Sequence, residues 1–160
     1  MKSDRGVIAS DSAIRADQRR ALQQLVGTMI PADAEFGVPG ADDDGIFADI
    51  LTLAEKSPEL VDGGLRALDD LALARHGAIF TELAAADAEA VAQAFASTSM
   101  AFVRAMVAMT VQCYYRDPRV MTALGMEPRA PYPGGFTIEQ GDWSLLDPVR
   151  RRGKLWRDAG

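Results

Sequence analysis

The chain has 160 residues, 48% of them hydrophobic, and its 17 Lys and Arg against 23 Asp and Glu give a formal net charge of −6. This length and composition predict one compact, soluble domain with a tail, and argue against a disordered chain or a disulfide-stabilised miniprotein. The acidic balance argues against nucleic-acid binding, which needs clustered positive charge. A single His and a single Cys exclude Cys- and His-based zinc sites and an intramolecular disulfide.

The hydrophobic periodicity predicts an all-α fold of five to six helices around one core, because no stretch alternates like a strand. The predicted helices span residues 11–29, 43–55, 57–76, 87–97, 98–115 and 117–124, and residues 1–126 form the bundle domain. Asp11 is predicted to cap the first helix, and Asp87 the fourth. Gly64 lies within the apolar stripe of the third helix, which predicts close approach of a neighbouring helix.

The helix at residues 98–115 is hydrophobic nearly all round. We expect Val103, Met106 and Val107 to share one face with Thr110 and Tyr114. Such a helix is either central in its bundle or covered by another chain. Arg104 lies near its middle, which argues against a membrane span.

Residues 127–160 have a different character and are predicted to form an extended, irregular tail that packs on the bundle or on a partner. Prolines and glycines are too frequent there for a helix, and aromatic residues are too frequent for a disordered linker. The aromatic residues of this tail are Tyr132, Phe136, Trp143 and Trp156.

No residue is assigned a catalytic, cofactor-binding or metal-binding role. His76 has no nucleophile or carboxylate at motif spacing, and Cys113 lies in an apolar helix where thiols are inert. The acidic run Asp42–Asp44 before Gly45 resembles part of a calcium loop, but Leu51 stands where the bidentate acid is needed. We interpret the run as an acidic helix N-terminus, which the helix dipole favours.

Two segments resemble a known family. Residues 110–125 contain Tyr-Tyr-Arg-Asp-Pro-Arg-Val, and residues 25–33 are Leu-Val-Gly-Thr-Met-Ile-Pro-Ala-Asp. Both are similar to motifs of the gluconate 2-dehydrogenase subunit 3 (gamma, or small subunit) family, and the resemblance extends over about residues 17–136. Structural roles are expected for the family-motif residues Pro31, Asp33, Asp117, Pro118, Gly125, Gly134 and Gly135.

The resemblance implies a non-catalytic accessory subunit that stabilises and chaperones a dehydrogenase. In such complexes a flavoprotein of the glucose–methanol–choline family carries FAD and oxidises a sugar, an alcohol or a glycoside, and a cytochrome c subunit often takes the electrons. The small subunit itself binds no cofactor. The residues expected at the partner interface are Tyr114, Tyr115, Arg119, Tyr132, Phe136, Trp143 and Trp156. The alternative is a free-standing helical protein that binds a ligand or assembles with itself.

Many members of this family carry a twin-arginine export signal. Arg19 and Arg20 form a twin arginine here, but no hydrophobic region follows them, and no signal peptide is visible. We therefore expect a cytoplasmic protein, or a periplasmic one if it is exported with a partner or if the chain has been trimmed.

Overall fold

The computed structural model describes residues 14–130, 132–135, 137 and 139–152, and the chain divides into two compact units at residue 128. Six α-helices lie in the described part of the first unit, and the described residues of the two units contain no strand. The prediction of an all-α fold is therefore confirmed.

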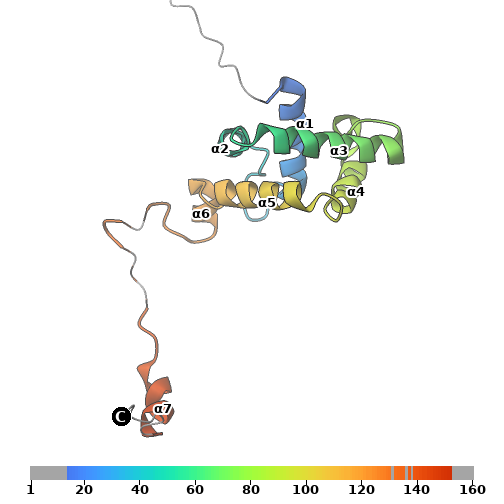
Figure 1. The fold of residues 1–160 in the computed structure, drawn as a ribbon. Coiled ribbons are helices and arrows are strands. Elements are labelled where there is room, and N and C mark those ends of the chain that lie inside the picture. The colour runs from blue at the N-terminus through green and yellow to red at the C-terminus, as the bar shows by residue number, and fades with distance from the viewer. Residues whose placement is uncertain (1–13, 131, 136, 138, 153–160) are drawn as a thin grey trace, which may run out of the picture. The chain divides into compact units, whose positions relative to one another are not determined.

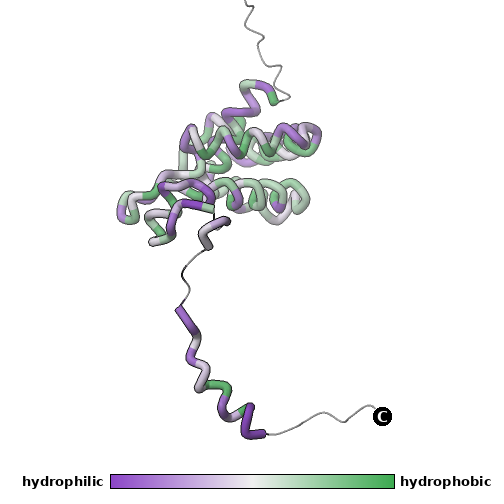
Figure 2. The backbone as a smooth tube through the Cα atoms, turned by 90° about the vertical axis from the view of Figure 1, so that its left-hand side faces the viewer, coloured by the Kyte–Doolittle hydropathy of each residue, from purple (hydrophilic) through white to green (hydrophobic). Residues whose placement is uncertain are grey.

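The helices of the first unit lie close to the predicted ranges. They are α1 (Ala16–Met29), α2 (Asp44–Ala54), α3 (Pro58–His76), α4 (Ala85–Phe95), α5 (Met100–Tyr114) and α6 (Pro118–Ala123), with a short 3₁₀-helix, η1 (Phe80–Glu82), between α3 and α4. In Figure 1, α3 and α5 lie side by side and α1 crosses both. Hydrophobic and hydrophilic residues are interleaved along the bundle helices, as Figure 2 shows.

The core is built from the apolar faces that the periodicity predicts. Among its most deeply buried side chains are Leu22, Val26, Ile46, Ile50, Val61 and Leu68. Each of them comes from α1, α2 or α3, and burial of such a side chain contributes about 1.5–3 kcal/mol. The fold is therefore held together mainly by apolar contacts between helix faces.

Gly64 of α3 lies directly against α5, as predicted. A Cβ atom at this position would overlap the ring of Phe102, whereas the neighbouring Gly63 has no atom within 4 Å of its own Cβ position. Phe102 is buried and packs edge-on against Phe95 of α4, with 6.0 Å between ring centroids. A glycine at position 64 therefore lets three helices meet around one phenylalanine.

The predicted start of the first helix at Asp11 is wrong. Asp11 lies outside the described residues, and Ile14 and Arg15, which are described, precede the first helical residue, Ala16. The backbone N–H of Arg15 donates to Oε1 of Gln18 at 2.9 Å. The N-cap backbone is thus capped by a side chain from inside the helix, that of Gln18, three residues after the N-cap. The helix therefore starts later than the predicted acidic N-cap at Asp11 implies.

The predicted N-cap role of Asp87 is also wrong. The N-cap of α4 is Ala84, and Asp87 lies in the first turn of the helix. Its carboxylate oxygen Oδ1 lies 3.9 Å from Nδ1 of His76, the last residue of α3. An acidic residue in the first turn interacts favourably with the helix dipole without capping a backbone N–H. An acidic residue near a helix start in the sequence can therefore be either the N-cap or a first-turn residue.

The buried face of α5 differs in part from the prediction. Phe102, Met106 and Tyr114 are buried, but Val107 is 43% exposed and Val111 is 41% exposed. The helix therefore lies at the side of the bundle and leaves an apolar strip uncovered. Within the described residues no single helix is long and apolar enough to cross a bilayer; α4 and α5 together would be, but they meet at 118°.

Sequence analysis did not predict η1, although its Phe80 is completely buried. The N–H of Phe80 donates to Oδ1 of Asp69 at 3.0 Å, and the Phe80 carbonyl accepts from Nε2 of Gln24 at 3.1 Å. Side chains of α1 and α3 thus satisfy the backbone of this turn, a tertiary arrangement that local periodicity does not reveal.

The second unit contains more helix than predicted. A 3₁₀-helix, η2 (Trp143–Leu146), continues into the short helix α7 (Asp147–Arg151). The Asp142 carboxylate accepts from the N–H of Ser144 at 2.9 Å, and Pro148 lies at the start of α7, where proline is well tolerated. The expectation of an entirely irregular tail is therefore wrong for residues 143–151.

Candidate partner-binding surface

The loop between α1 and α2 forms a compact turn. The backbone of Asp33 pairs with that of Val38, with N–O distances of 3.1 and 3.0 Å, and Gly37 has a φ of 64°, which favours glycine. Oδ1 of Asp33 also accepts from the N–H groups of Glu35 and Phe36, at 2.8 and 3.2 Å. This turn presents Phe36 at its tip, where the side chain is 68% exposed.

The two tyrosines at the end of α5 have different environments. Tyr114 is buried, and its hydroxyl donates to the carbonyl of Pro39 at 3.1 Å, which fixes the loop against the helix. Tyr115 is 52% exposed, and its ring meets that of Tyr114 edge-on at 5.3 Å. Burial raises the pKa of the Tyr114 hydroxyl, with a smaller contribution from the nearby Asp33 carboxylate. One tyrosine therefore supports the site, and the other lies at its surface.

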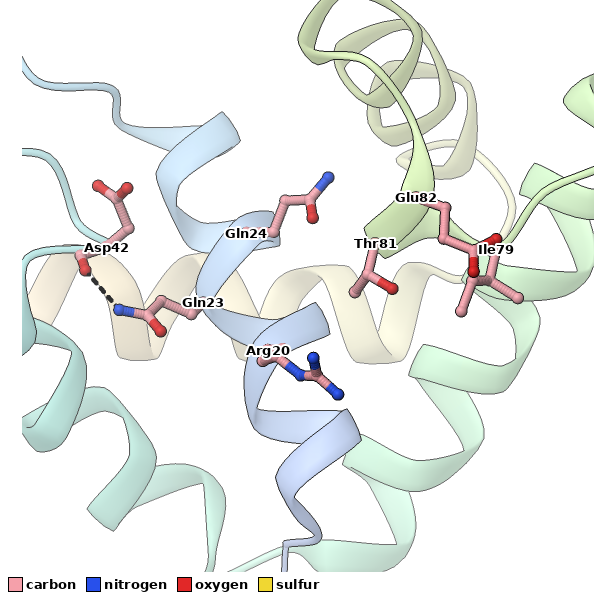
Figure 3. A pocket seen from close by; sticks show the side chains of 7 residues that line it. All are labelled: Arg20, Gln23, Gln24, Asp42, Ile79, Thr81 and Glu82. Carbon is pink, nitrogen blue, oxygen red and sulfur yellow. Dashed lines mark hydrogen bonds between the residues drawn. The ribbon is translucent and has the colours of Figure 1, made fainter.

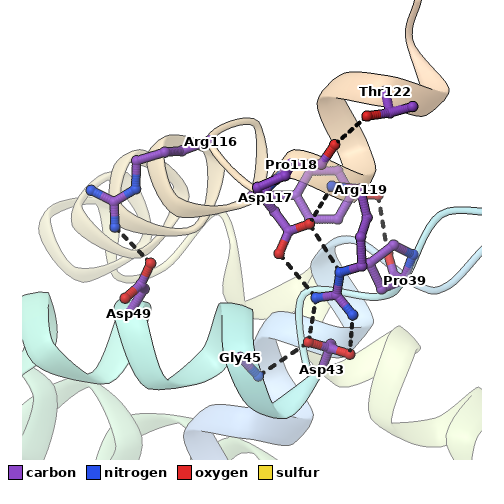
Figure 4. Close-up of polar contacts among 10 residues, drawn as sticks. Pro39, Asp43, Gly45, Asp49, Arg116, Asp117, Pro118, Arg119 and Thr122 are labelled. Carbon is purple, nitrogen blue, oxygen red and sulfur yellow. Dashed lines mark hydrogen bonds and ion pairs between the residues drawn. The ribbon is translucent and has the colours of Figure 1, made fainter. Parts of the chain in front are cut away.

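Arg119 connects the start of α6 to the start of α2 (Figure 4). Its guanidinium donates to both carboxylate oxygens of Asp43, at 2.7 and 3.0 Å, and also to Asp117, at 2.9 and 3.0 Å. Asp117 and Asp43 are themselves the N-caps of α6 and α2, accepting from the N–H groups of Arg119 and Gly45. A single arginine thus holds two helix starts together.

This pairing shifts the ionisation of the carboxylates. The hydrogen bond from Arg119 lowers the pKa of Asp43 to about 2 and is likewise the main cause of the lowered pKa of Asp117. A second ion pair, between Arg116 and Asp49 at 2.7 Å, lies beside it. The expected interface residue Arg119 is therefore engaged by carboxylates of its own chain.

These elements enclose an apolar groove of about 410 Å³. The groove is lined by Ile30, Pro31, Asp33, Phe36, Val38, Tyr114, Tyr115, Val120, Ala123 and Leu124. Its residues come from the end of α1, the following loop, the end of α5 and α6, so segments about 85 residues apart in the sequence meet here. We call this feature the loop–α6 groove.

The exposed apolar surface extends beyond the groove itself. Met126 is 53% exposed, and the half-exposed positions Val107 and Val111 of α5 lead at a spacing of four residues to Tyr115 of the groove. A spacing of four places side chains on one face of a helix. Large apolar surfaces that are rimmed by polar groups are typical of protein–protein contact sites.

A second hollow, of about 580 Å³, lies between α1 and η1 and has polar walls. Figure 3 shows that the polar ends of Arg20, Gln24 and Asp42 point away from one another. Gln23 donates to the Asp42 carbonyl at 2.8 Å, so two of these residues serve the fold. Polar groups that converge on one point are the usual mark of a small-molecule site, and they are not found in this hollow.

The residues with catalytic potential lie apart from the groove. Cys113 is 2% exposed, and burial raises the pKa of its thiol. His76 lies at the end of α3 with Asp87 as its carboxylate neighbour. Within the described part of the chain, no group of three or more His, Cys, Asp or Glu side chains is arranged to hold a metal ion.

The remaining sequence-predicted residues lie in the second unit, except Pro118 and Gly125. Tyr132 is 88% exposed and Trp143 is 61% exposed, while Phe136 and Trp156 lie outside the described residues. Gly134 lies in a turn, and Gly135, with a φ of 63°, accepts from the Arg129 guanidinium at 2.6 Å. In the first unit, Pro118 begins α6, and Gly125 ends it with a φ of 73°.

The family model described as gluconate 2-dehydrogenase subunit 3 matches residues 16–134, which include every residue that lines the loop–α6 groove. No curated protein and no solved structure matches the chain. Since the match covers well over half of the sequence, the chain belongs to the gluconate 2-dehydrogenase subunit 3 family.

Proposed function

We propose that this chain is the non-catalytic small subunit of an FAD-dependent sugar, alcohol or glycoside dehydrogenase, which it stabilises and chaperones. The catalytic subunit is a flavoprotein of the glucose–methanol–choline family, and FAD resides in that subunit. A cytochrome c that takes the electrons would be a third component of the complex.

One observation carries the proposal. The two segments that resemble family motifs, residues 25–33 and 110–125, come together in the loop–α6 groove. Their polar residues Asp33, Asp117 and Arg119, together with Asp43 at the start of α2, are used in turns, caps and ion pairs that hold the groove in shape. Their apolar residues form its walls. The motif residues thus build and support a surface for contact, which is what an accessory subunit needs.

The uncovered strip on α5 supports the same proposal. A helix that is hydrophobic on nearly all sides is stable at the side of a bundle when another protein covers its outer face. Val107 and Val111 remain half exposed in the chain alone, and Tyr115 continues their line to the groove. Covering this strip would bury apolar area in the complex, and the catalytic subunit would gain stability through the linked binding equilibrium.

The test is co-expression of the full chain, carrying an affinity tag, with a glucose–methanol–choline flavoprotein encoded by the same genome. We expect the flavoprotein to co-purify with bound FAD, measured by flavin absorbance, and to elute with the chain as one species in size-exclusion chromatography. Expression of the flavoprotein alone should give a much lower soluble yield. Equal yield and equal activity without the chain, together with separate elution, would contradict the proposal and favour a free-standing helical protein.

A further inference from the structure

The charged group that lines the loop–α6 groove is a carboxylate. Asp33 is the charged residue among those that line it. Among the described residues, Arg116 and Arg119, which are adjacent in sequence to the groove residues Tyr115 and Val120, are engaged by carboxylates: Arg116 by Asp49, and Arg119 by Asp43 and Asp117. The electrostatic influence of Asp33 reaches the groove wall, since its carboxylate contributes to the raised pKa of Tyr114. The groove therefore presents an apolar surface with a negative charge.

The rest of the groove favours a segment of protein as its occupant. Phe36, Tyr115 and Leu124 contribute exposed apolar side chains from three different elements. Aromatic side chains around an apolar centre are the usual anchors of protein–protein interfaces.

The groove is also held rigidly before anything binds. The Asp33 turn, the hydrogen bond from Tyr114 to Pro39 and the paired contacts of Arg119 with Asp43 fix its walls from three sides. A binding surface that is already ordered loses less conformational entropy on association. Such a surface is suited to accepting a defined segment of a partner.

We propose that the loop–α6 groove binds an apolar segment of the catalytic subunit that carries an Arg or Lys, whose cation pairs with Asp33. This inference rests on the proposed function and adds to it the site of contact and the chemistry of the partner segment. The cation complements the negative charge of the groove, and the apolar side chains fill the space between Phe36, Tyr115 and Leu124.

The test compares three variants of the tagged full chain, each co-expressed with the same flavoprotein as in the test of the proposed function. Leu124→Asp places a charge on the apolar wall. Asp33→Asn removes the negative charge but keeps the Oδ1 acceptor for the N–H groups of Glu35 and Phe36. Leu73→Asp is the matched control, because Leu73 is a similarly exposed leucine on α3 outside the groove. Circular dichroism of each purified variant verifies that it remains helical.

We expect Leu124→Asp to weaken binding of the flavoprotein by tenfold or more, roughly the effect of disrupting an interface anchor. Asp33→Asn should weaken it about threefold to tenfold and reduce its dependence on salt, as loss of one interfacial charge does. Leu73→Asp should bind as the unaltered chain does.

Normal binding by both groove variants, while the unaltered chain binds the flavoprotein, would overturn the groove inference and leave the proposed function standing. Failure of the unaltered chain to bind the flavoprotein would instead overturn the proposed function itself. If the chain alone forms a dimer that Leu124→Asp abolishes, the occupant is a second copy of this chain, and the inference is wrong.

Discussion

Gly63 and Gly64 are consecutive residues of α3, yet replacing each by alanine should change stability in opposite directions. Alanine is favoured over glycine within a helix by about 1 kcal/mol. Gly63 is exposed and has open space at its Cβ position, so Gly63→Ala should raise the free energy of unfolding by about that amount. Gly64 faces Phe102, and a methyl group there overlaps the ring.

The cost at Gly64 depends on how far Phe102 can move. Overpacking a core costs about 1–3 kcal/mol. Phe102 is 2% exposed and packs against Phe95, but an apolar hollow of about 140 Å³ borders both rings and allows some adjustment. We therefore take about 2 kcal/mol for overpacking. After the gain in helix propensity, Gly64→Ala should lower the free energy of unfolding by about 1 kcal/mol.

The two alanine variants should therefore differ by about 2 kcal/mol, which corresponds to roughly 4–8 °C in Tm for a chain of this size. Thermal and urea unfolding followed by far-ultraviolet circular dichroism measure the difference. Adding Phe102→Leu to Gly64→Ala should cost less than the sum of the two single changes, because the smaller side chain relieves the overlap. An equal stabilisation by Gly63→Ala and Gly64→Ala would refute the reasoning.

Three further predictions concern polar groups and the thiol. Tyr114→Phe removes the hydrogen bond to the Pro39 carbonyl and should lower the free energy of unfolding by about 1 kcal/mol in urea titrations; no change would show that the bond contributes nothing. Asp43→Asn keeps an N-cap but loses the exposed ion pair with Arg119, and should cost up to about 1 kcal/mol at neutral pH. Since folding lowers the Asp43 pKa from 3.8 to about 2, this difference should be complete above pH 3.8 and disappear as the pH falls through about 2; a difference that persists in stronger acid would contradict it. Cys113 is buried and should react with a thiol reagent only as the chain unfolds, so rapid labelling of the native protein would disprove its placement in the core.

The sequence predicts most of the bundle because its signals are local. Apolar residues at helical spacing identify the buried faces of α1, α2 and α3, and the Asp117–Pro118 pair and Gly125 mark the start and end of α6. Gly64 predicts a close helix contact because a glycine inside a helix is otherwise unfavourable. The errors at Asp11 and Asp87 concern helix starts, where several nearby polar residues can satisfy the same backbone groups.

The tail illustrates the limits of composition. Proline and glycine are frequent after residue 126, so sequence analysis predicted no helix there. In η2 and α7, however, Asp142 caps the first turn, and Pro148 occupies a position near a helix start, where it does not interrupt hydrogen bonding. A count of helix-breaking residues over a long segment therefore misses a short helix in which the proline lies in the first turn.

The sequence by itself determined the all-α fold, the family and the buried faces of α1, α2 and α3, since each depends on residue types at fixed spacing along the chain. Tertiary structure alone decided which residues share a surface. It buries Tyr114 against Pro39, turns Arg119 toward Asp43, and brings the loop after α1 beside α6. These contacts join residues far apart in sequence, and no local periodicity encodes which helix faces meet. The loop–α6 groove, and with it the proposed site of contact, therefore appears only when the helices are packed.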